Sequence, residues 1–303
     1  MKYDYGKPEQ GFSFEHCSFY HSLINMGYDV LYFDFLSLCQ QYGKDAMNLA
    51  LMDAARRFCP DLAFFILFQD EFYPEAIRSL PCPTFNWFCD DHWRYDNFSR
   101  HWAKNFTYIS TTSKTALVKY KQDGFTNVIP TQWACNHYLY RPTINPNNYA
   151  VTFVGMPHGE RPQIINFLHQ CGIAVHCWGQ GWPNGRISQE DMIQVFGSSK
   201  INLNLTNSSN CELQQIKGRN FEVPGCGGFL LTGKAENLAE YYLPDKEIAC
   251  FETLEELTEK ITYYVAHEDE RRRIAKNGYE RTRKEHTYEQ RLRHIFQIIE
   301  RGL

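Results

Sequence analysis

Apolar runs typical of buried strands alternate with amphipathic helical stretches along the whole of this sequence. No other feature constrains the fold as strongly, because this alternation predicts parallel sheets covered by helices on both faces. The alternating pattern occurs twice. The strands predicted in the first half are residues 28–35, 61–68, 84–88, 106–110 and 126–129. Those predicted in the second half are residues 149–155, 173–178, 200–205, 228–232 and 247–251.

Helical stretches separate most of these runs. Residues 15–26 and 45–58 each carry apolar side chains along one helical face. In the second half, Thr-Leu-Glu-Glu at residues 253–256 is a capping box that opens a helix, and a long helical tail follows from residue 269. The predicted fold class is therefore α/β.

The length of the chain favours two domains, since 303 residues exceed what one small hydrophobic core organises. Residues 140–148 are polar, include two prolines and separate the two alternating blocks, as a linker would. We therefore predict an N-terminal domain of residues 1–143, a second domain of residues 144–285 and a final helix at residues 286–303.

Charge and cysteine usage exclude several classes of protein. The chain has 31 Lys and Arg residues against 35 Asp and Glu residues, and a net charge of −4 does not favour nucleic acid as a partner. Its 11 cysteines are scattered without a Cys-x-x-Cys pair, which is typical of reduced thiols. The longest apolar run, residues 62–68, is too short to span a bilayer. We expect a cytoplasmic protein without a transmembrane segment.

A candidate anion site follows the first strand of the second half. The sequence from Phe153 to Arg161 has a strand, a loop containing Gly155 and the start of a helix. Glycine lets the backbone approach a phosphate, a helix N-terminus offers unpaired N–H groups, and Arg161 adds a cation. The alternative interpretation, an ordinary tight turn, is equally compatible with these residues.

A second constellation gathers charge around a glycine turn. Lys217, Arg219 and Glu222 precede Gly227 and Gly228. A nucleotide sugar needs cationic partners for its diphosphate and a carboxylate for its ribose hydroxyls, and this segment offers both. The alternative is a helix, a turn and a buried strand with solvated cations.

The second half of the chain resembles the spore maturation protein CgeB-like branch of the GT-B glycosyltransferases. Such a resemblance implies two Rossmann-like domains, with the final helix packing back on the first domain. It covers most of the chain after the linker. The segments that carry it are the Gly155 loop and residues 178–182, 219–224, 227–232, 246–248, 255–257, 274–279 and 285–288.

The resemblance also implies roles for particular residues. Glu222 matches the position that binds the donor ribose in related enzymes, and Lys217 and Arg219 match cationic contacts to the diphosphate. Gly155, Arg161, Gly227 and Gly228 complete the expected donor site. GT-B enzymes stabilise the leaving diphosphate without a bound ion, so neither a metal nor another cofactor is expected.

One position departs from the family pattern. Many retaining relatives have a glutamate eight residues before the ribose ligand, where this chain has Gln214. The anomeric outcome of the reaction is therefore left open.

The first half contains two candidate sites for the acceptor. Glu15 and His16 follow a glycine-bearing segment, and either side chain is of a type that can act as a general base. Capping or packing is the alternative role for both.

The rival acceptor site follows the strand at residues 84–88. Asp91 is a candidate catalytic base there, and Trp87, Asp90 and His92 are candidate acceptor contacts, with Trp87 stacking on a sugar face. Aromatic residues are more often part of a core. A metal site at Asp90, Asp91 and His92 is not favoured, because consecutive residues at a strand end point in different directions.

The leading interpretation is a glycosyltransferase that moves a hexose from a nucleotide sugar, UDP by family resemblance, to a hydroxyl of a glycan or other acceptor. A nucleotide-sugar epimerase of the same architecture is one alternative. The other is a sugar- or nucleotide-binding protein without turnover, because fold alone does not prove catalysis. The sequence does not determine the oligomeric state.

Overall fold

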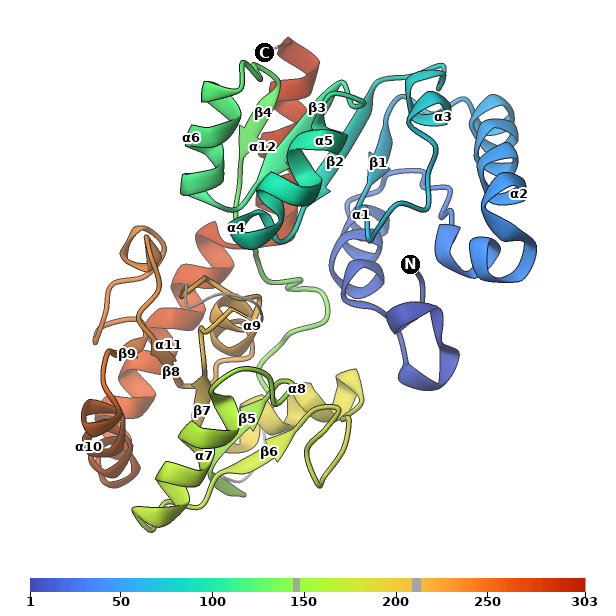
Figure 1. Ribbon diagram of the computed structural model, residues 1–303. Helices are drawn as coiled ribbons and strands as arrows, with labels where there is room; N and C mark the ends of the chain where they lie inside the picture. The colour runs from blue at the N-terminus through green and yellow to red at the C-terminus, as the bar shows by residue number, and fades with distance from the viewer. Residues whose placement is uncertain (144–147, 209–213, 303) are drawn as a thin grey trace. The chain divides into compact units, whose positions relative to one another are not determined.

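The structure, a computed structural model, describes residues 1–143, 148–208 and 214–302. Its contacts divide the chain into two compact units. Unit 1 comprises Met1–Gln132 and Arg291–Leu303, and unit 2 comprises Trp133–Gln290. Each unit has a parallel sheet with helices packed against it (Figure 1). The α/β fold class predicted from the alternating pattern is confirmed.

Unit 1 contains a four-stranded parallel sheet in the order β1-β2-β3-β4. Short π-helical turns precede α1 and α5. The strands are β1 (Ala63–Phe65), β2 (Thr84–Phe88), β3 (Tyr108–Thr111) and β4 (Val128–Pro130). The helices are α1 (His21–Asn25), α2 (Phe35–Phe58), α3 (Pro74–Arg78), α4 (Asp91–Arg94), α5 (Arg100–Ala103), α6 (Lys114–Gln122) and, from Arg291 onward, α12 (Tyr288–Arg301).

The predicted strand at residues 28–35 is wrong. Residues 28–34 have no regular secondary structure, and α2 begins at Phe35, ten residues earlier than the helix predicted at 45–58. A strand requires a hydrogen-bonded neighbour, and no described residue pairs with residues 28–34 in a sheet. The other predicted strands each overlap a strand of the structure.

Unit 2 contains a five-stranded parallel sheet in the order β6-β5-β7-β8-β9. The first strand, β5, lies between β6 and β7, with Thr152 opposite both His176 and Asn202. The strands are β5 (Tyr149–Val154), β6 (His176–Trp178), β7 (Ser199–Asn204), β8 (Leu230–Gly233) and β9 (Ala249–Phe251). The helices are α7 (Arg161–Gln170), α8 (Gln189–Ser198), α9 (Arg219–Gly225), α10 (Leu254–Ala266) and α11 (Glu268–Glu285).

Two apolar clusters cover the two faces of this sheet. Phe153 and Leu203 point into the cluster formed with α7, α10 and α11, whereas Val154 and Leu230 point into the cluster formed with α8 and α9. Strands buried on both faces explain why these segments read as continuous apolar runs. The capping box is also confirmed, because the Thr253 side chain accepts a hydrogen bond from the Glu256 amide at 3.2 Å.

The unit boundaries differ from the domain boundaries predicted from the sequence. The chain passes between the units at Gln132–Trp133 and at Gln290–Arg291, rather than near residues 143 and 285. Residues 133–143 pack on unit 2, where Cys135 and Tyr140 are buried in the cluster beside α8 and α9. The middle of the expected linker, residues 144–147, lies outside the described residues.

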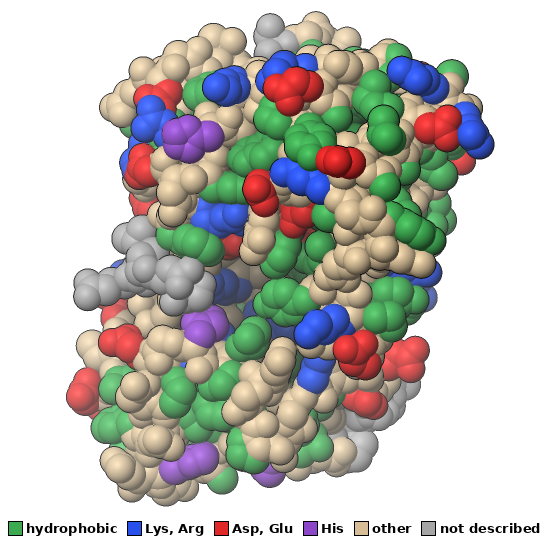
Figure 2. Space-filling model, turned by 45° about the vertical axis from the view of Figure 1, so that its right-hand side comes forward, with side chains coloured by type: hydrophobic (Ala, Val, Ile, Leu, Met, Phe, Trp, Pro, Cys, Tyr) green, Lys and Arg blue, Asp and Glu red, His purple; other side chains and the backbone are tan. Residues whose placement is uncertain are grey.

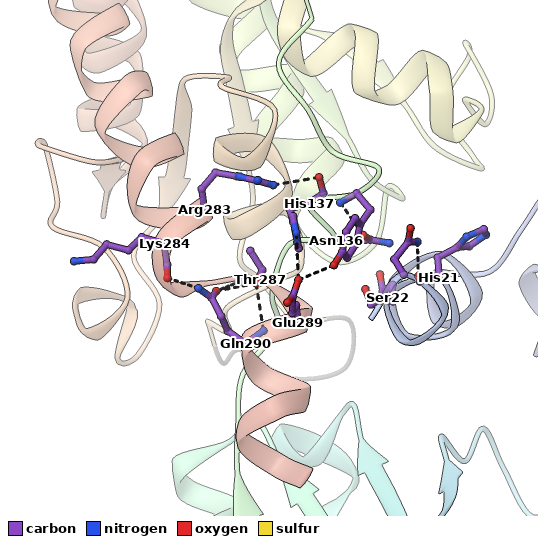
Figure 3. A network of polar contacts seen from close by, with 12 residues as sticks. His21, Ser22, Asn136, His137, Arg283, Lys284, Thr287, Glu289 and Gln290 are labelled. Carbon is purple, nitrogen blue, oxygen red and sulfur yellow. Dashed lines mark hydrogen bonds and ion pairs between the residues drawn. The ribbon is translucent and has the colours of Figure 1, made fainter. Parts of the chain in front are cut away.

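A polar network holds the junction between α11 and α12 within unit 2 (Figure 3). Cys135 exchanges backbone hydrogen bonds with His286 and Tyr288, at 2.9 and 3.0 Å. Beside this pair, the Glu289 carboxylate accepts a hydrogen bond from the Tyr138 hydroxyl at 2.6 Å and lies 3.5 Å from His137 Nε2. The network therefore fixes residues 133–138 against the start of α12.

The remaining part of α12 belongs to unit 1. The Tyr108 hydroxyl donates to the Ile299 carbonyl at 3.4 Å, and the rings of Tyr28 and Phe296 lie 5.4 Å apart. Across the described residues, no helix is both long and apolar enough to cross a membrane. On the face shown in Figure 2, acidic and basic side chains are interspersed.

Candidate functional site

The strand order of unit 2 locates the candidate site. The chain runs from β5 to β6 on one side of β5 and then crosses to β7 on its other side. The strand order therefore reverses between β5 and β7. Ligands of open α/β sheets bind outside the carboxyl ends of the strands at such a switch point. The loop after Val154, the residues after Asn204 and the start of α9 form this edge.

Two glycine-containing loops are locked together at this edge. The Gly155 amide donates to the Trp178 carbonyl at 2.8 Å, and the Trp182 indole donates to the Gly155 carbonyl at 2.7 Å. Gly179 has a φ of +144°, and a Cβ there would lie 2.3 Å from the Gly155 oxygen. Only glycine fits Gly179. The loops therefore form a rigid floor whose backbone a ligand can approach closely.

Arg161 ties the loop after β5 to the end of β7. Its guanidinium donates to the Met156 carbonyl at 3.0 Å and to the Leu205 carbonyl at 2.9 Å, and the residue is only 6% exposed. Burial lowers the pKa of Arg161 to about 10. The direct bidentate phosphate contact expected for Arg161 would compete with these two carbonyls, so the structure gives it a positioning role.

Arg219 and Glu222 form an ion pair at the start of α9. The carboxylate of Glu222 accepts from Arg219 Nη1, and Arg219 Nε donates to the Val154 carbonyl at 3.3 Å. The Arg219 side chain is 28% exposed, whereas that of Glu222 is 1% exposed. The Arg219 side chain is therefore partly exposed, whereas the Glu222 carboxylate is enclosed. A ribose contact by Glu222 would require this enclosed carboxylate to become accessible.

Two further groups, the polar His158 and the positively charged Lys217, lie beside this pair. Burial, followed by the charges of Arg161 and Lys217, lowers the pKa of His158 to about 4. His158 is therefore neutral at pH 7. Because the charge of Lys217 contributes to the lowered pKa of His158, the loop after β5 and the segment before α9 are close. Sequence analysis did not single out His158, although it lies in the glycine loop that we had selected.

A buried amide network supports the start of α9. The Asn204 side chain donates to Asn220 at 3.1 Å and to the Thr232 hydroxyl at 3.0 Å, and Asn220 accepts from the Lys217 amide at 2.8 Å. Asn204, Asn220 and Thr232 are all at most 3% exposed. Fully satisfied buried networks fix geometry. Sequence analysis missed these residues, although Asn204 stands out as an amide in an apolar strand.

The structure does not bring Gly227 and Gly228 to this edge. They follow the end of α9 and precede β8, which places them at the amino end of the strands. Gly228 is needed for packing, because a Cβ there would lie 2.7 Å from the Phe196 carbonyl. Gly227 has a φ of +72° and makes the turn. Their expected donor-binding role is therefore corrected to a structural one.

Known proteins are similar to this chain in sequence and in fold. The family described as "Glycosyl transferase-like" matches residues 161–297. The matched residues are similar to this family, and the fold of the chain is that of the GT-B glycosyltransferases. A curated relative, spore protein CgeB of Bacillus subtilis, is 21% identical over 233 residues, which are 68% of this chain and 72% of that protein.

Solved structures share the fold of this chain. HepE of Anabaena, determined in complex with UDP-glucose, matches with a TM-score of 0.65 at 13% identity, over 94% of this chain and 89% of HepE. Sucrose-phosphate synthase of Thermosynechococcus elongatus matches with a TM-score of 0.61 at 10% identity, over 86% of this chain and 78% of the synthase.

In unit 1, His16 is packed among rings. It is 6% exposed, and its ring stacks on Phe12 with centroids 4.6 Å apart. Burial, with His21 and Lys2, lowers the pKa of His16 to about 4. Glu15 is partly buried and lines a pocket of about 750 Å³ together with Phe19 and Phe64. Of the two predicted bases, Glu15 is therefore the one with access to a cavity.

The predicted acceptor residues in and directly after β2 differ in how far they are buried. Trp87 is fully buried and packs on Phe19, so its expected stacking on a sugar is wrong. Asp91 is 2% exposed and accepts from the Tyr120 hydroxyl at 3.3 Å, and burial raises the pKa of Asp91 to about 6. A base must reach its substrate, so Asp91 is corrected to a structural residue. Asp90 and His92 are partly exposed in the neighbouring turn.

Metal ligation was also considered for these acidic and imidazole groups. Within residues 1–143, 148–208 and 214–302, no three His, Cys, Asp or Glu side chains gather in a way that could hold an ion. The candidate site of unit 2 consists of the β5 and β6 loops, Lys217 and the Arg219–Glu222 pair.

Proposed function

We propose that this glycosyltransferase moves a hexose from a UDP-sugar to a hydroxyl group of a glycan or similar acceptor, without a metal ion or another cofactor. The observation that carries the proposal is the partly exposed side chain of Arg219, held by Val154 and Glu222 at the switch point of the sheet. A UDP-glucose complex of HepE, which shares the fold, supports UDP as the nucleotide.

The residues of unit 2 supply the chemistry that this reaction needs. Cleavage of the bond to the sugar leaves negative charge on the diphosphate, and preorganised cations stabilise that charge as it develops. Arg219 is already oriented by its two partners, so little reorganisation is required. Lys217 adds a second positive charge, and the rigid Gly155 floor lets the backbone approach the phosphates.

Acceptor binding is assigned to unit 1, with Glu15 as the proposed general base. This assignment follows the family resemblance and the exclusion of Asp91 and His16 by burial. Asp90 and His92 remain candidate acceptor contacts. A cytoplasmic location is proposed from the scattered cysteines.

The donor is tested by following the thermal midpoint with UDP-, GDP-, dTDP- and ADP-sugars. A ligand that binds only the native state raises the midpoint by mass action. We expect a selective shift with UDP-sugars that Lys217→Ala reduces. Lys234→Ala is the matched control, because Lys234 also follows a strand of this sheet but is 64% exposed and paired with Glu252. No shift with any nucleotide would refute the proposal.

Turnover is tested by measuring the nucleotide and sugar products. Release of UDP that increases with added hydroxyl acceptor identifies transfer. An isomerised UDP-sugar formed without acceptor would identify an epimerase, and binding without any product would identify a non-catalytic protein.

A further inference from the structure

The loop between β5 and α7 holds the side chain of His158 at the carboxyl edge of the unit 2 sheet. The His158 amide donates to the Met156 carbonyl at 3.0 Å, and the His158 carbonyl accepts from the Arg161 amide at 3.3 Å. Gly159 follows with a φ of +57°, and a Cβ there would lie 3.8 Å from the Ser208 carbonyl after β7. The imidazole therefore has a fixed backbone, next to the ends of both strands at the switch point.

Two cations act on this imidazole from different elements. Burial is the largest cause that lowers the pKa of His158 to about 4, and the positive charges of Arg161 on α7 and Lys217 ahead of α9 come next. The Glu160 carboxylate in the same loop accepts from the Asn207 side-chain amide at 3.1 Å. A proton on His158 would add a third positive charge to this group, and a nearby like charge disfavours the charged form. The ring is therefore neutral at pH 7.

The surroundings also select which ring nitrogen carries the proton. Nδ1 of His158 is enclosed and has no hydrogen-bond partner among the described residues. An enclosed N–H without an acceptor costs about 1–3 kcal/mol, so the proton of the neutral ring belongs on Nε2. Because His158 as a whole is partly exposed while Nδ1 is enclosed, Nε2 is the ring nitrogen that a ligand can reach. The side chain therefore offers one uncharged N–H donor at this edge of the sheet.

An anion is the ligand that this arrangement favours. The guanidinium of Arg161 donates to the Met156 and Leu205 carbonyls, so its charge attracts an anion while these hydrogen bonds stay within the protein. Lys217 adds a second positive charge. Hydrogen bonds to an ionised acceptor are about twice as strong as those between neutral groups. A neutral Nε2–H therefore binds an anion well, without a third charge that the two cations would repel.

We propose that His158 binds a diphosphate group as an uncharged hydrogen-bond donor, through Nε2. This inference rests on the proposed function, in which the diphosphate is that of the UDP-sugar. Lys217 and Arg219 supply charge to this group, whereas His158 supplies a directed hydrogen bond from the loop after β5. Since a proton on Nδ1 would have no acceptor among the described residues, the ring stays neutral after binding. The donor therefore binds without taking up a proton at His158.

The hydrogen bond is tested by calorimetric titration of three variants with UDP-glucose at pH 7. His158→Leu keeps a side chain in the loop but has no N–H donor, and we expect its affinity to be about tenfold lower than that of the native protein. His158→Gln places an amide N–H at a reach similar to that of Nε2, and it should restore most of the affinity. His176→Leu is the matched control, because His176 is exposed at the amino end of β6.

Proton uptake is measured by repeating the titration in buffers of different ionisation enthalpy. We expect the native protein and His158→Gln to take up the same number of protons, because the imidazole adds none. UDP-glucose suits this measurement, since its diphosphate is esterified at both ends and does not itself titrate near pH 7. A proton taken up by the native protein alone would overturn the neutral role of His158.

Inorganic pyrophosphate separates this inference from the proposed function. If pyrophosphate binds the native protein more tightly than His158→Leu while UDP-sugars neither bind nor react, the diphosphate site stands and the glycosyltransferase is refuted. Equal affinity of the native protein and His158→Leu for UDP-glucose would overturn the role of His158 and leave the proposed function standing. Equally weak binding by His158→Leu and His158→Gln would also overturn this role, because the ring would then only pack. Absence of binding of both probes would overturn both.

Discussion

At the scale of single residues, burial separates groups that carry chemistry from groups that carry structure. Arg219 and Glu222 are three positions apart, yet the Arg219 side chain is partly exposed and the Glu222 carboxylate is enclosed. Asp91, which the sequence offers as a base, is enclosed by Tyr120 and other hydroxyls. These differences depend on neighbours distant in sequence, so residue type alone does not reveal them.

Glu222→Gln distinguishes a ribose ligand from a residue that orients Arg219. If the carboxylate orients Arg219, the variant should weaken binding of UDP and of pyrophosphate by similar factors, about tenfold, since only the diphosphate contact is disturbed. Calorimetric titration measures both constants. Glu252→Gln, which alters an exposed pair, is the control. Loss of UDP affinity with pyrophosphate affinity unchanged would restore the ribose role.

Asp91 should make stability depend on pH. Its pKa is about 6 in the folded protein against a usual value of 3.8, so the unfolded chain releases this proton first as pH rises. The Asp91 carboxyl therefore contributes its full stabilisation below about pH 4. This contribution, as much as about 3 kcal/mol, is lost as the pH rises from about 4 to about 6.

Asp91→Asn should remove this loss. Its free energy of unfolding, measured in urea between pH 4 and pH 7, should rise relative to that of the native protein over this interval. Parallel profiles for the two proteins would contradict the assignment.

At the scale of elements, close approach between loops shapes the candidate site. Gly179→Ala should lower the thermal midpoint and weaken UDP binding for two reasons. The added Cβ would clash with the Gly155 carbonyl, and alanine would be strained at this positive φ. Gly185→Ala is the matched control in the same loop, with a φ of +66° and no atom within 4 Å of the added Cβ. We expect UDP affinity to fall at least tenfold in the first variant only, as measured by calorimetry.

Element boundaries follow from local signals only where a neighbour is present. Thr253 caps α10 as its sequence predicts, because a cap needs only the first turn of its own helix. Residues 28–34 have equally clear strand composition but pair in a sheet with no other residue that the structure describes, because a strand depends on another segment.

At the scale of the whole molecule, the two units should respond differently to the nucleotide. All proposed donor contacts lie in unit 2, so UDP should slow hydrogen exchange at the ends of β5, β7 and β8. Strands β1 to β4 of unit 1 should be unaffected. Protection confined to unit 1 would contradict the assignment of the donor site, and mass spectrometry of peptic peptides resolves the two regions.

The sequence by itself determined the features that depend on local pattern. Alternation of apolar runs and helices specified two α/β blocks, and the Gly155 loop with Lys217 and Arg219 indicated a candidate site, since loops at strand ends form sites in such folds. Only the tertiary structure decided which groups are accessible. It buried Glu222, Asp91 and Trp87 and moved Gly227 and Gly228 to the opposite edge, because burial and strand direction arise from contacts between segments far apart in the chain.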